Sequence, residues 1–100
     1  GSERTVDEAY EAARLCGIQL LAALKEHVGS LDNVKRIVKL LGMVNSAPDF
    51  AEQPKVINGA SDLMYEVFGD PGKHARSAVG VPALPLNAAV EVDAIVALKA

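Results

Sequence analysis

The amino-acid sequence predicts an α+β fold in which two helices cover one face of a three-stranded sheet. Stretches with helical and strand periodicity follow one another along the 100 residues in the order helix, strand, helix, strand, strand. This length suits a single domain spanning residues 1–100. Half of the residues are hydrophobic and 23% are charged, which is a globular composition able to form a packed core.

The first helix is predicted between Thr5 and Gly29. Thr5 and Glu8 form the Ser/Thr-x-x-Glu pattern of a capping box, in which both side chains satisfy backbone N–H groups at a helix start. Gly29 is a typical residue for the helix end. Apolar residues recur at helical spacing between these signals: Val6, Ala9, Ala13, Cys16, Leu20 and Leu24. We therefore expect Cys16 to be a small buried hydrophobe and not a nucleophile.

Residues 34–44 fit two patterns. Val34, Ile37, Val38 and Leu41 recur at helical spacing, whereas the β-branched content and the turn signal at residues 30–33 favour a strand. We predict a strand, and its solvated end carries a short basic cluster of Lys35, Arg36 and Lys39.

The second helix is predicted to begin near Pro54 and to end at the turn of residues 69–72. Its apolar stripe consists of Val56, Ile57, Ala60, Leu63, Met64, Val67 and Phe68. Asn58 and Gly59 have poor helix propensity, so their place inside this helix implies a packing requirement or a specific contact.

Two further strands are predicted at residues 74–81 and 89–98, separated by a connection that contains two prolines. In the last strand Val90, Val92, Ala94, Val96 and Leu98 share one face, and Glu91, Asp93 and Ile95 share the other. The sheet face without helices would expose apolar residues such as Leu41, Met43 or Ile95. This pattern predicts oligomerisation, or further strands supplied from elsewhere.

Charge and composition exclude several classes of function. The net charge is −3, which argues against nucleic acid as a partner. One cysteine and two histidines do not form the usual structural zinc patterns, and we expect neither a metal nor a cofactor. No apolar run reaches the length of a membrane span and the first residues lack the pattern of a signal peptide, so we expect a cytoplasmic protein without a membrane partner.

Arg76 is the strongest candidate for a binding residue. Small residues follow it at Ser77, Ala78 and Gly80, which leaves room for a ligand, and an arginine fork suits a small organic acid. The alternative is an ion pair with Glu91 or Asp93 across the sheet. These two acids point to the same side of one strand, where they are either solvated charges or a pair in which one carboxyl is poised for proton transfer.

The segment from residue 74 to residue 96 resembles the C-terminal signature of the RidA/YjgF family of reactive-intermediate deaminases. The resemblance rests on Arg76 followed by Ser77, on the turn at Leu84 and Pro85, and on the strand that contains Glu91. Residues 31–36 and 56–68 are also similar to the family, so the resemblance covers nearly the whole chain. It favours a strand at residues 34–44.

This resemblance implies a chorismate-mutase-like fold that assembles as a homotrimer with ligand clefts between adjacent subunits. It also implies hydrolysis of reactive enamine and imine acids of the 2-aminoacrylate type to 2-keto acids and ammonia, without metal or cofactor. Arg76 takes the place of the carboxylate-binding arginine and Glu91 that of the acid that positions water. Asn58 matches a helix asparagine near the cleft, and Ala78 replaces a cysteine, with its backbone N–H still available to a ligand.

Two other functions remain open at this point. Some relatives are credited with endoribonuclease activity, and a trimeric module that binds small acids without turnover fits the same residues. Family members begin with a strand pair before the first helix, whereas this chain starts at the helix cap. We therefore expect an N-terminally short domain that lacks the strands which usually contribute to the neighbouring cleft.

Overall fold

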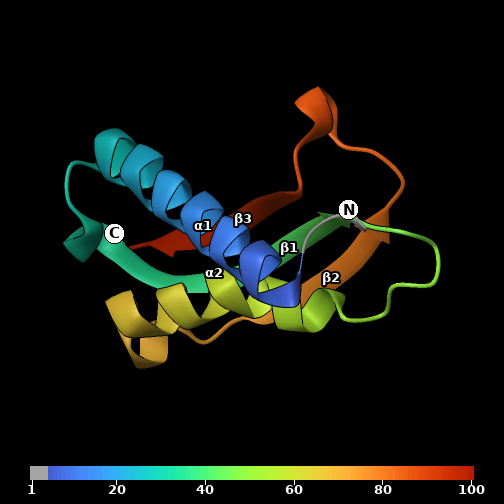
Figure 1. Ribbon diagram of the computed structural model, residues 1–100. Coiled ribbons are helices and arrows are strands. Elements are labelled where there is room, and N and C mark those ends of the chain that lie inside the picture. Colours follow the sequence, from blue (N-terminus) through green and yellow to red (C-terminus); the bar gives the residue numbers. More distant parts are fainter. Residues whose placement is uncertain (1–4) are drawn as a thin grey trace.

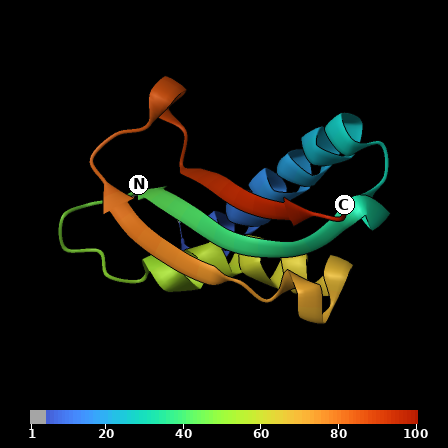
Figure 2. The same ribbon diagram turned by 180° about the vertical axis from the view of Figure 1, so that it is seen from behind.

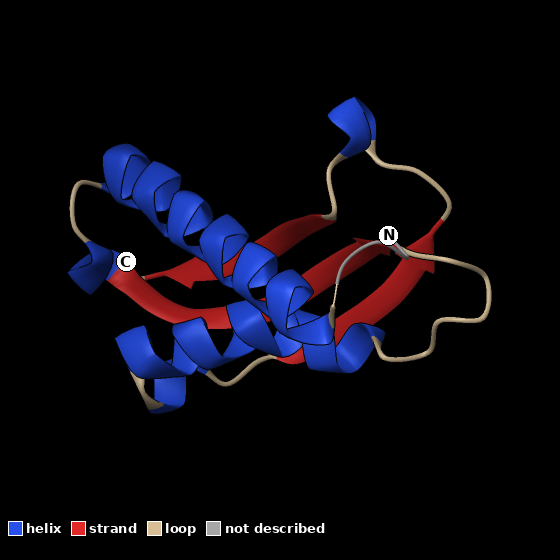
Figure 3. Cartoon of the chain, viewed as in Figure 1, coloured by secondary structure: helices blue, strands red, loops and turns tan. Residues whose placement is uncertain are grey.

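The computed structural model describes residues 5–100 and confirms the predicted fold class. The helices and strands, in chain order, are α1 (Val6–Val28), β1 (Val34–Asn45), α2 (Gln53–Phe68), β2 (Ala75–Val81) and β3 (Val90–Leu98). Short 3₁₀ turns at Leu31–Asn33, Asp70–Gly72 and Pro85–Asn87 join these elements (Figure 1, Figure 3). The order helix, strand, helix, strand, strand is as predicted, and the last two strands each begin one residue later than expected.

Helix α1 begins and ends at the predicted signals. The Thr5 hydroxyl accepts a hydrogen bond from the backbone N–H of Glu8 at 3.1 Å, and the Glu8 carboxylate accepts one from the Thr5 N–H at 3.3 Å. This is the reciprocal capping box that the sequence predicts. At the other end Gly29 adopts φ 87°, a left-handed conformation that favours glycine. Local sequence therefore determines both helix ends.

Strand β1 explains why its residues also fit a helical pattern. Its register with β3 is irregular between Val34 and Arg36 and again between Ile37 and Lys39. Each irregularity adds a residue on β1, so Val34, Ile37 and Leu40 are all buried although they lie three residues apart. Beyond Leu40 the strand alternates regularly. The basic cluster Lys35, Arg36 and Lys39 is exposed, as predicted.

The sheet order is β2-β1-β3, with β1 parallel to β2 and antiparallel to β3. Helix α2 provides the connection between the parallel strands, since such a crossover needs a long segment on one face of the sheet. In Figure 1 both helices lie in front of the sheet. Helix α1 contacts β3, whereas α2 contacts β1 and β2. In the order β2-β1-β3, β2 and β3 are the two edge strands of this sheet.

The two helices approach each other closely along glycines. A Cβ at Gly59 would overlap the carbonyl oxygen of Tyr10 on α1, so only glycine fits there. Gly17 on α1 faces Ala60 and Leu63 in the same seam. On the solvent side the Arg14 guanidinium donates to the Glu66 carboxylate at 2.8 Å, and this contact lowers the pKa of Glu66. Close packing thus accounts for Gly59 inside a helix.

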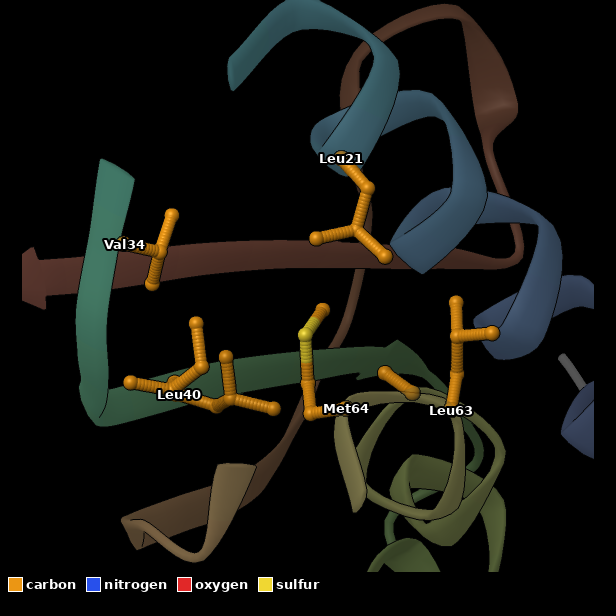
Figure 4. Packing of buried hydrophobic residues seen from close by; sticks show 7 residues of the cluster. Leu21, Val34, Leu40, Leu63 and Met64 are labelled. Atoms are coloured by element: carbon orange, nitrogen blue, oxygen red, sulfur yellow. The ribbon is translucent and has the colours of Figure 1, made fainter. Parts of the chain in front are cut away.

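The main hydrophobic core lies between the helices and the sheet. Leu21 from α1, Leu63 and Met64 from α2, and Val34 and Leu40 from β1 point into the same space (Figure 4). Leu40 and Met64 are fully buried. Burial of such apolar side chains contributes roughly 1.5–3 kcal/mol each.

The opposite face of the sheet carries no helix in the part of the chain that the structure describes (Figure 2). By register, Leu41, Met43, Val79 and Ile95 lie on this open face. Ile95 is 61% exposed, whereas Leu41 and Met43 are half-buried. The predicted uncovered apolar face is therefore present. Within residues 5–100 no helix has the length and hydropathy that a membrane span requires.

Candidate functional site

Arg76 lies near the start of β2, and its side chain contacts helix α2. It pairs in register with Leu40, which faces the helices, and it is half-buried. Its Nη1 donates to the Asn58 side-chain oxygen at 2.6 Å and to the Ser61 hydroxyl at 3.2 Å. Asn58 and Ser61 are three residues apart on α2, so they lie on the same helix face. The structure therefore brings together Arg76 and Asn58, two of the predicted site residues.

These contacts leave part of the guanidinium available. Arginine has five N–H donors, and both acceptors on α2 are bound by Nη1. Among the described residues, no hydrogen bond is formed by Nε or Nη2. These two nitrogens form the fork that binds a carboxylate through two parallel hydrogen bonds. Arg76 is thus held by one nitrogen and can bind an acid with the other two.

A second set of polar groups adjoins Arg76. The Ser61 hydroxyl lies 2.9 Å from Nε2 of His74, and Nδ1 of His74 lies 2.6 Å from the carbonyl oxygen of Gly72. Sequence reasoning missed this pair, because a lone serine in a helix and a lone histidine before a strand are common. The available signal was spacing, since Ser61 follows Asn58 by one helical turn and His74 precedes Arg76 by two strand residues.

A shallow pocket of about 380 Å³ opens at these side chains. It is lined by Ser61, Tyr65, Gly72, Lys73, His74 and Arg76. Lys73 is exposed, and its Nζ lies 3.3 Å from Oδ1 of Asp70 and over the ring of Tyr65. Among the described lining residues none is acidic. The pocket therefore offers cationic and hydroxyl groups, which suit a small anion.

Glu91 lies on the opposite side of the sheet from Arg76. Glu91 pairs with Met43 on β1. Its neighbours Val90 and Val92 pack against the helices, so by strand alternation the Glu91 side chain lies on the open face of the sheet. Strand β1 separates it from β2. The backbones of Arg76 and Glu91 are separated by two strand spacings of about 4.8 Å and by three residues along β1 at about 3.3 Å each. Together these offsets place the two backbones roughly 14 Å apart.

The alternative of an ion pair between Arg76 and Glu91 or Asp93 is therefore wrong. Strand β1 lies between the strands that carry these residues, and both acids lie on the sheet face opposite to Arg76. Arg76 bonds to α2 instead.

Ala78 and Cys16 are both packing residues here. Ala78 is half-buried and packs on the apolar cluster that includes Val44 and Ile57. The Cys16 thiol donates a hydrogen bond to the Val90 carbonyl at 3.5 Å, and the residue is half-buried, whereas the sequence predicted a buried one. Burial, followed by the negative charge of Glu91, raises the pKa of Cys16. A raised pKa leaves this thiol protonated and weakly nucleophilic.

A further pocket, of about 540 Å³, lies at the carboxyl ends of the parallel strands β1 and β2. Its polar lining includes Asn45, Ser46 and Gln53, and Gln53 donates to the Phe50 carbonyl at 2.8 Å. Across residues 5–100 no group of three or more His, Cys, Asp or Glu side chains is placed to hold a metal ion.

The architecture is that of an α+β domain with two helices on a mixed three-stranded sheet, which is the chorismate-mutase-like class. Residues 1–98 match the model of the family described as "YjgF/chorismate mutase-like, putative endoribonuclease". The chain belongs to this family, as the resemblance of residues 74–96 predicted.

Known proteins are similar to this chain in sequence, and two of them also in structure. The chain is 54% identical to Protein TCP17 of Trypanosoma cruzi over 99% of its own length. It superimposes with a TM-score of 0.95 at 49% identity on Atu1372 of Agrobacterium tumefaciens, a protein of unknown function, over 97% of this chain. A "putative endoribonuclease" of Shewanella oneidensis gives a TM-score of 0.88 at 40% identity over 92% of this chain.

The chain spans only part of each relative. It covers 62% of the Trypanosoma protein, 62% of the Agrobacterium protein and 61% of the Shewanella protein.

Proposed function

We propose that this domain supplies the carboxylate-binding part of a hydrolase site for reactive 2-imino and enamine acids, which yields 2-keto acids and ammonia. The observation that carries the proposal is the Arg76 guanidinium, whose Nη1 is bound by Asn58 and Ser61 while Nε and Nη2 stay available. Because the Arg76 side chain is already held in place, little further side-chain entropy is lost when it binds and orients a small acid. The resemblance of residues 74–96 to the reactive-intermediate deaminases supports the same reading.

The proposed chemistry needs an activated water. Glu91 takes a proton from water as the water oxygen bonds to the carbon of the protonated imine, which gives a neutral carbinolamine. Glu91 then passes this proton to the amino nitrogen, and ammonia leaves as the carbon–nitrogen bond breaks. The hydroxyl proton passes to the departing ammonia as the carbonyl of the keto acid forms. The products are a 2-keto acid and ammonia, and no metal or cofactor takes part. Within one chain Glu91 lies on the other sheet face from Arg76. We therefore propose that the complete site forms between copies of the chain in a homotrimer.

The open sheet face supports such an assembly. Leu41, Met43, Val79 and Ile95 would be covered by neighbouring copies, which removes apolar surface from water. The backbone N–H of Ala78 and the side chain of Asn58 are the proposed further contacts to the substrate.

The assay follows keto-acid release from freshly generated 2-aminoacrylate. We expect Arg76→Ala to lower kcat/KM roughly 100-fold, because charge-assisted hydrogen bonds to the carboxylate are lost. Arg36→Ala, which removes an exposed arginine of β1, is the matched control and should keep full activity. An undiminished rate in Arg76→Ala contradicts the proposal. Thermal stabilisation by pyruvate or benzoate without any turnover would instead identify a small-acid-binding module.

Mixing two inactive variants tests whether the site lies between copies. Arg76→Ala and Glu91→Gln are unfolded together and refolded in equal amounts. If adjacent subunits supply one residue each, about one quarter of the sites in random trimers contain both native residues and activity returns. If activity does not return while each variant refolds as a trimer, the two residues do not form a shared site.

Endoribonuclease activity is the second candidate, because the family description and the Shewanella relative both carry that name. Lys35, Arg36 and Lys39 form an exposed basic cluster on β1 that suits a phosphate backbone. Cleavage of a labelled RNA that is lost when all three are changed to Gln would support it. Cleavage that persists in this triple variant, or no cleavage at low salt, contradicts it.

A further inference from the structure

Ser61, His74 and the Gly72 carbonyl are joined in succession by two hydrogen bonds beside Arg76. A carbonyl oxygen only accepts hydrogen bonds, which assigns the ring proton of neutral His74 to Nδ1. Nε2 is then an acceptor, and the Ser61 hydroxyl donates its proton to it at 2.9 Å. A serine held by an imidazole whose other nitrogen is fixed by an acceptor is the arrangement of an activated nucleophile.

The hydrogen bond from Arg76 also orients the Ser61 hydroxyl toward His74. Nη1 of Arg76 only donates, so the Ser61 oxygen accepts that hydrogen bond at 3.2 Å and keeps its single proton for His74. The neighbouring cation also favours the negative charge that develops on a reacting oxygen. The contacts with His74 and Arg76 therefore both favour loss of the proton from the Ser61 oxygen.

The set is held rigidly. Ser61 lies in the interior of helix α2, and Gly72 is buried against that helix so closely that a Cβ would overlap the Met64 carbonyl oxygen. The orienting carbonyl is fixed as a result. Ser61 and His74 also line the pocket of about 380 Å³, so a ligand can reach both. Rigid elements that position reacting groups beside a pocket are a requirement for catalysis.

We propose that Ser61 is a catalytic nucleophile and His74 its general base, acting on small esters or thioesters that carry a carboxylate. The Ser61 oxygen bonds to the acyl carbon while its proton passes to His74 Nε2. The carbon–oxygen or carbon–sulfur bond breaks, and the leaving group takes that proton. A water then attacks the acyl-serine, again through His74, and releases the acid. Arg76 binds the substrate carboxylate.

This activity goes beyond the proposed imine hydrolysis and shares with it Arg76 and the contact of Arg76 with Ser61. A different role for the same contacts is to fasten the start of β2 to α2. That role predicts lower stability in variants and no covalent chemistry at Ser61, which separates the two possibilities by experiment.

The direct test is covalent labelling by a fluorophosphonate, which reacts with activated serines, followed by intact mass and peptide mapping. We expect one adduct at Ser61, none in Ser61→Ala, and at least tenfold slower labelling in His74→Gln. Ser77→Ala is the matched control, because Ser77 adjoins Arg76 in sequence but pairs with Leu41 on the open face. No adduct on the wild type, or an adduct that persists in Ser61→Ala or forms equally fast in His74→Gln, overturns the proposal.

A pair of esters tests the substrate class. Release of acetate from 4-acetoxybenzoate should be at least tenfold faster than from methyl 4-acetoxybenzoate, which lacks the carboxylate. Ser61→Ala should abolish both reactions. Equal rates for the two esters, or rates unchanged in Ser61→Ala, would overturn the assignment. Because the imine assay follows keto-acid release, loss of either activity leaves the other measurable. Circular dichroism and Tm of each variant identify any that fail to fold.

Discussion

Arg76 and Glu91 differ in what surrounds them, although both are half-buried. Arg76 is bound to two side chains of α2, so its orientation is set before a ligand arrives. Glu91 forms no hydrogen bond to a described residue, yet its charge reaches Cys16 on α1 and contributes to the raised pKa of that thiol. Cys16 therefore reports on the surroundings of Glu91.

We predict that alkylation of Cys16 responds to Glu91. The raised pKa means that native thiolate forms only above the pH at which the unfolded thiol ionises, and stability falls as the pH rises through that range. Glu91→Gln removes one of the two causes, so the pH midpoint of iodoacetamide alkylation should move down. Asp93→Asn is the control and should leave the midpoint unchanged. A midpoint that does not move in Glu91→Gln would place its charge away from Cys16.

At the scale of elements, α1 and α2 are held together by shape as much as by hydrophobicity. Gly59 lets the α2 backbone touch the carbonyl of Tyr10, and Gly17 lies against Ala60 and Leu63. Asn58 lies beside this seam and reaches the sheet. The closeness of the helices therefore helps to set the position of the side chains that hold Arg76.

We predict that Gly59→Ala destabilises the domain by about 1–3 kcal/mol, because the new methyl group meets fixed backbone. Gly17→Ala is the matched comparison, since its methyl group meets the end of the flexible Leu63 side chain at 2.9 Å, which can shift. Better helix propensity then offsets much of its cost. Urea unfolding monitored by circular dichroism measures both. Equal stability of Gly59→Ala and wild type would show that the helices can separate at little cost.

In the whole molecule, helices α1 and α2 both lie on one side of the sheet (Figure 2). The core between helices and sheet is closed, whereas the open face keeps apolar side chains in contact with solvent. Arg76 and Glu91 lie toward opposite edges of the sheet. Assembly is one way to satisfy both features at once, which is why the proposed trimer and the proposed site depend on each other.

We predict that Ile95→Lys reduces the oligomeric state without unfolding the domain. Ile95 is 61% exposed on the open face, and a buried lysine there would lack a partner. Leu15→Lys is the control, because Leu15 is 54% exposed on α1 and lies away from that face. Light scattering should give about three chain masses for wild type and Leu15→Lys and less for Ile95→Lys. A wild type of one chain mass, or an unchanged Ile95→Lys, contradicts the proposed assembly.

The features of this protein that depend on neighbours along the chain follow from local sequence. The capping box at Thr5, the Gly29 end and the alternation from Val90 onward arise from local hydrogen bonding and period, so they were predictable. Residues 34–44 were ambiguous for a physical reason. Two register irregularities place the buried residues three apart, which is also the spacing of apolar residues in a helix. Only the pairing with β3 distinguishes the two structures.

The surroundings of the site depend on contacts between segments that are distant along the chain. Whether Arg76 meets Glu91 or Asn58 depends on which strand lies between the edges, and strand order is set by pairing between distant segments that periodicity does not encode. The contact of Ser61 with His74 likewise joins a helix to the residue before a strand. Local patterns thus determined the elements, and the packing of those elements decided which chemical groups meet.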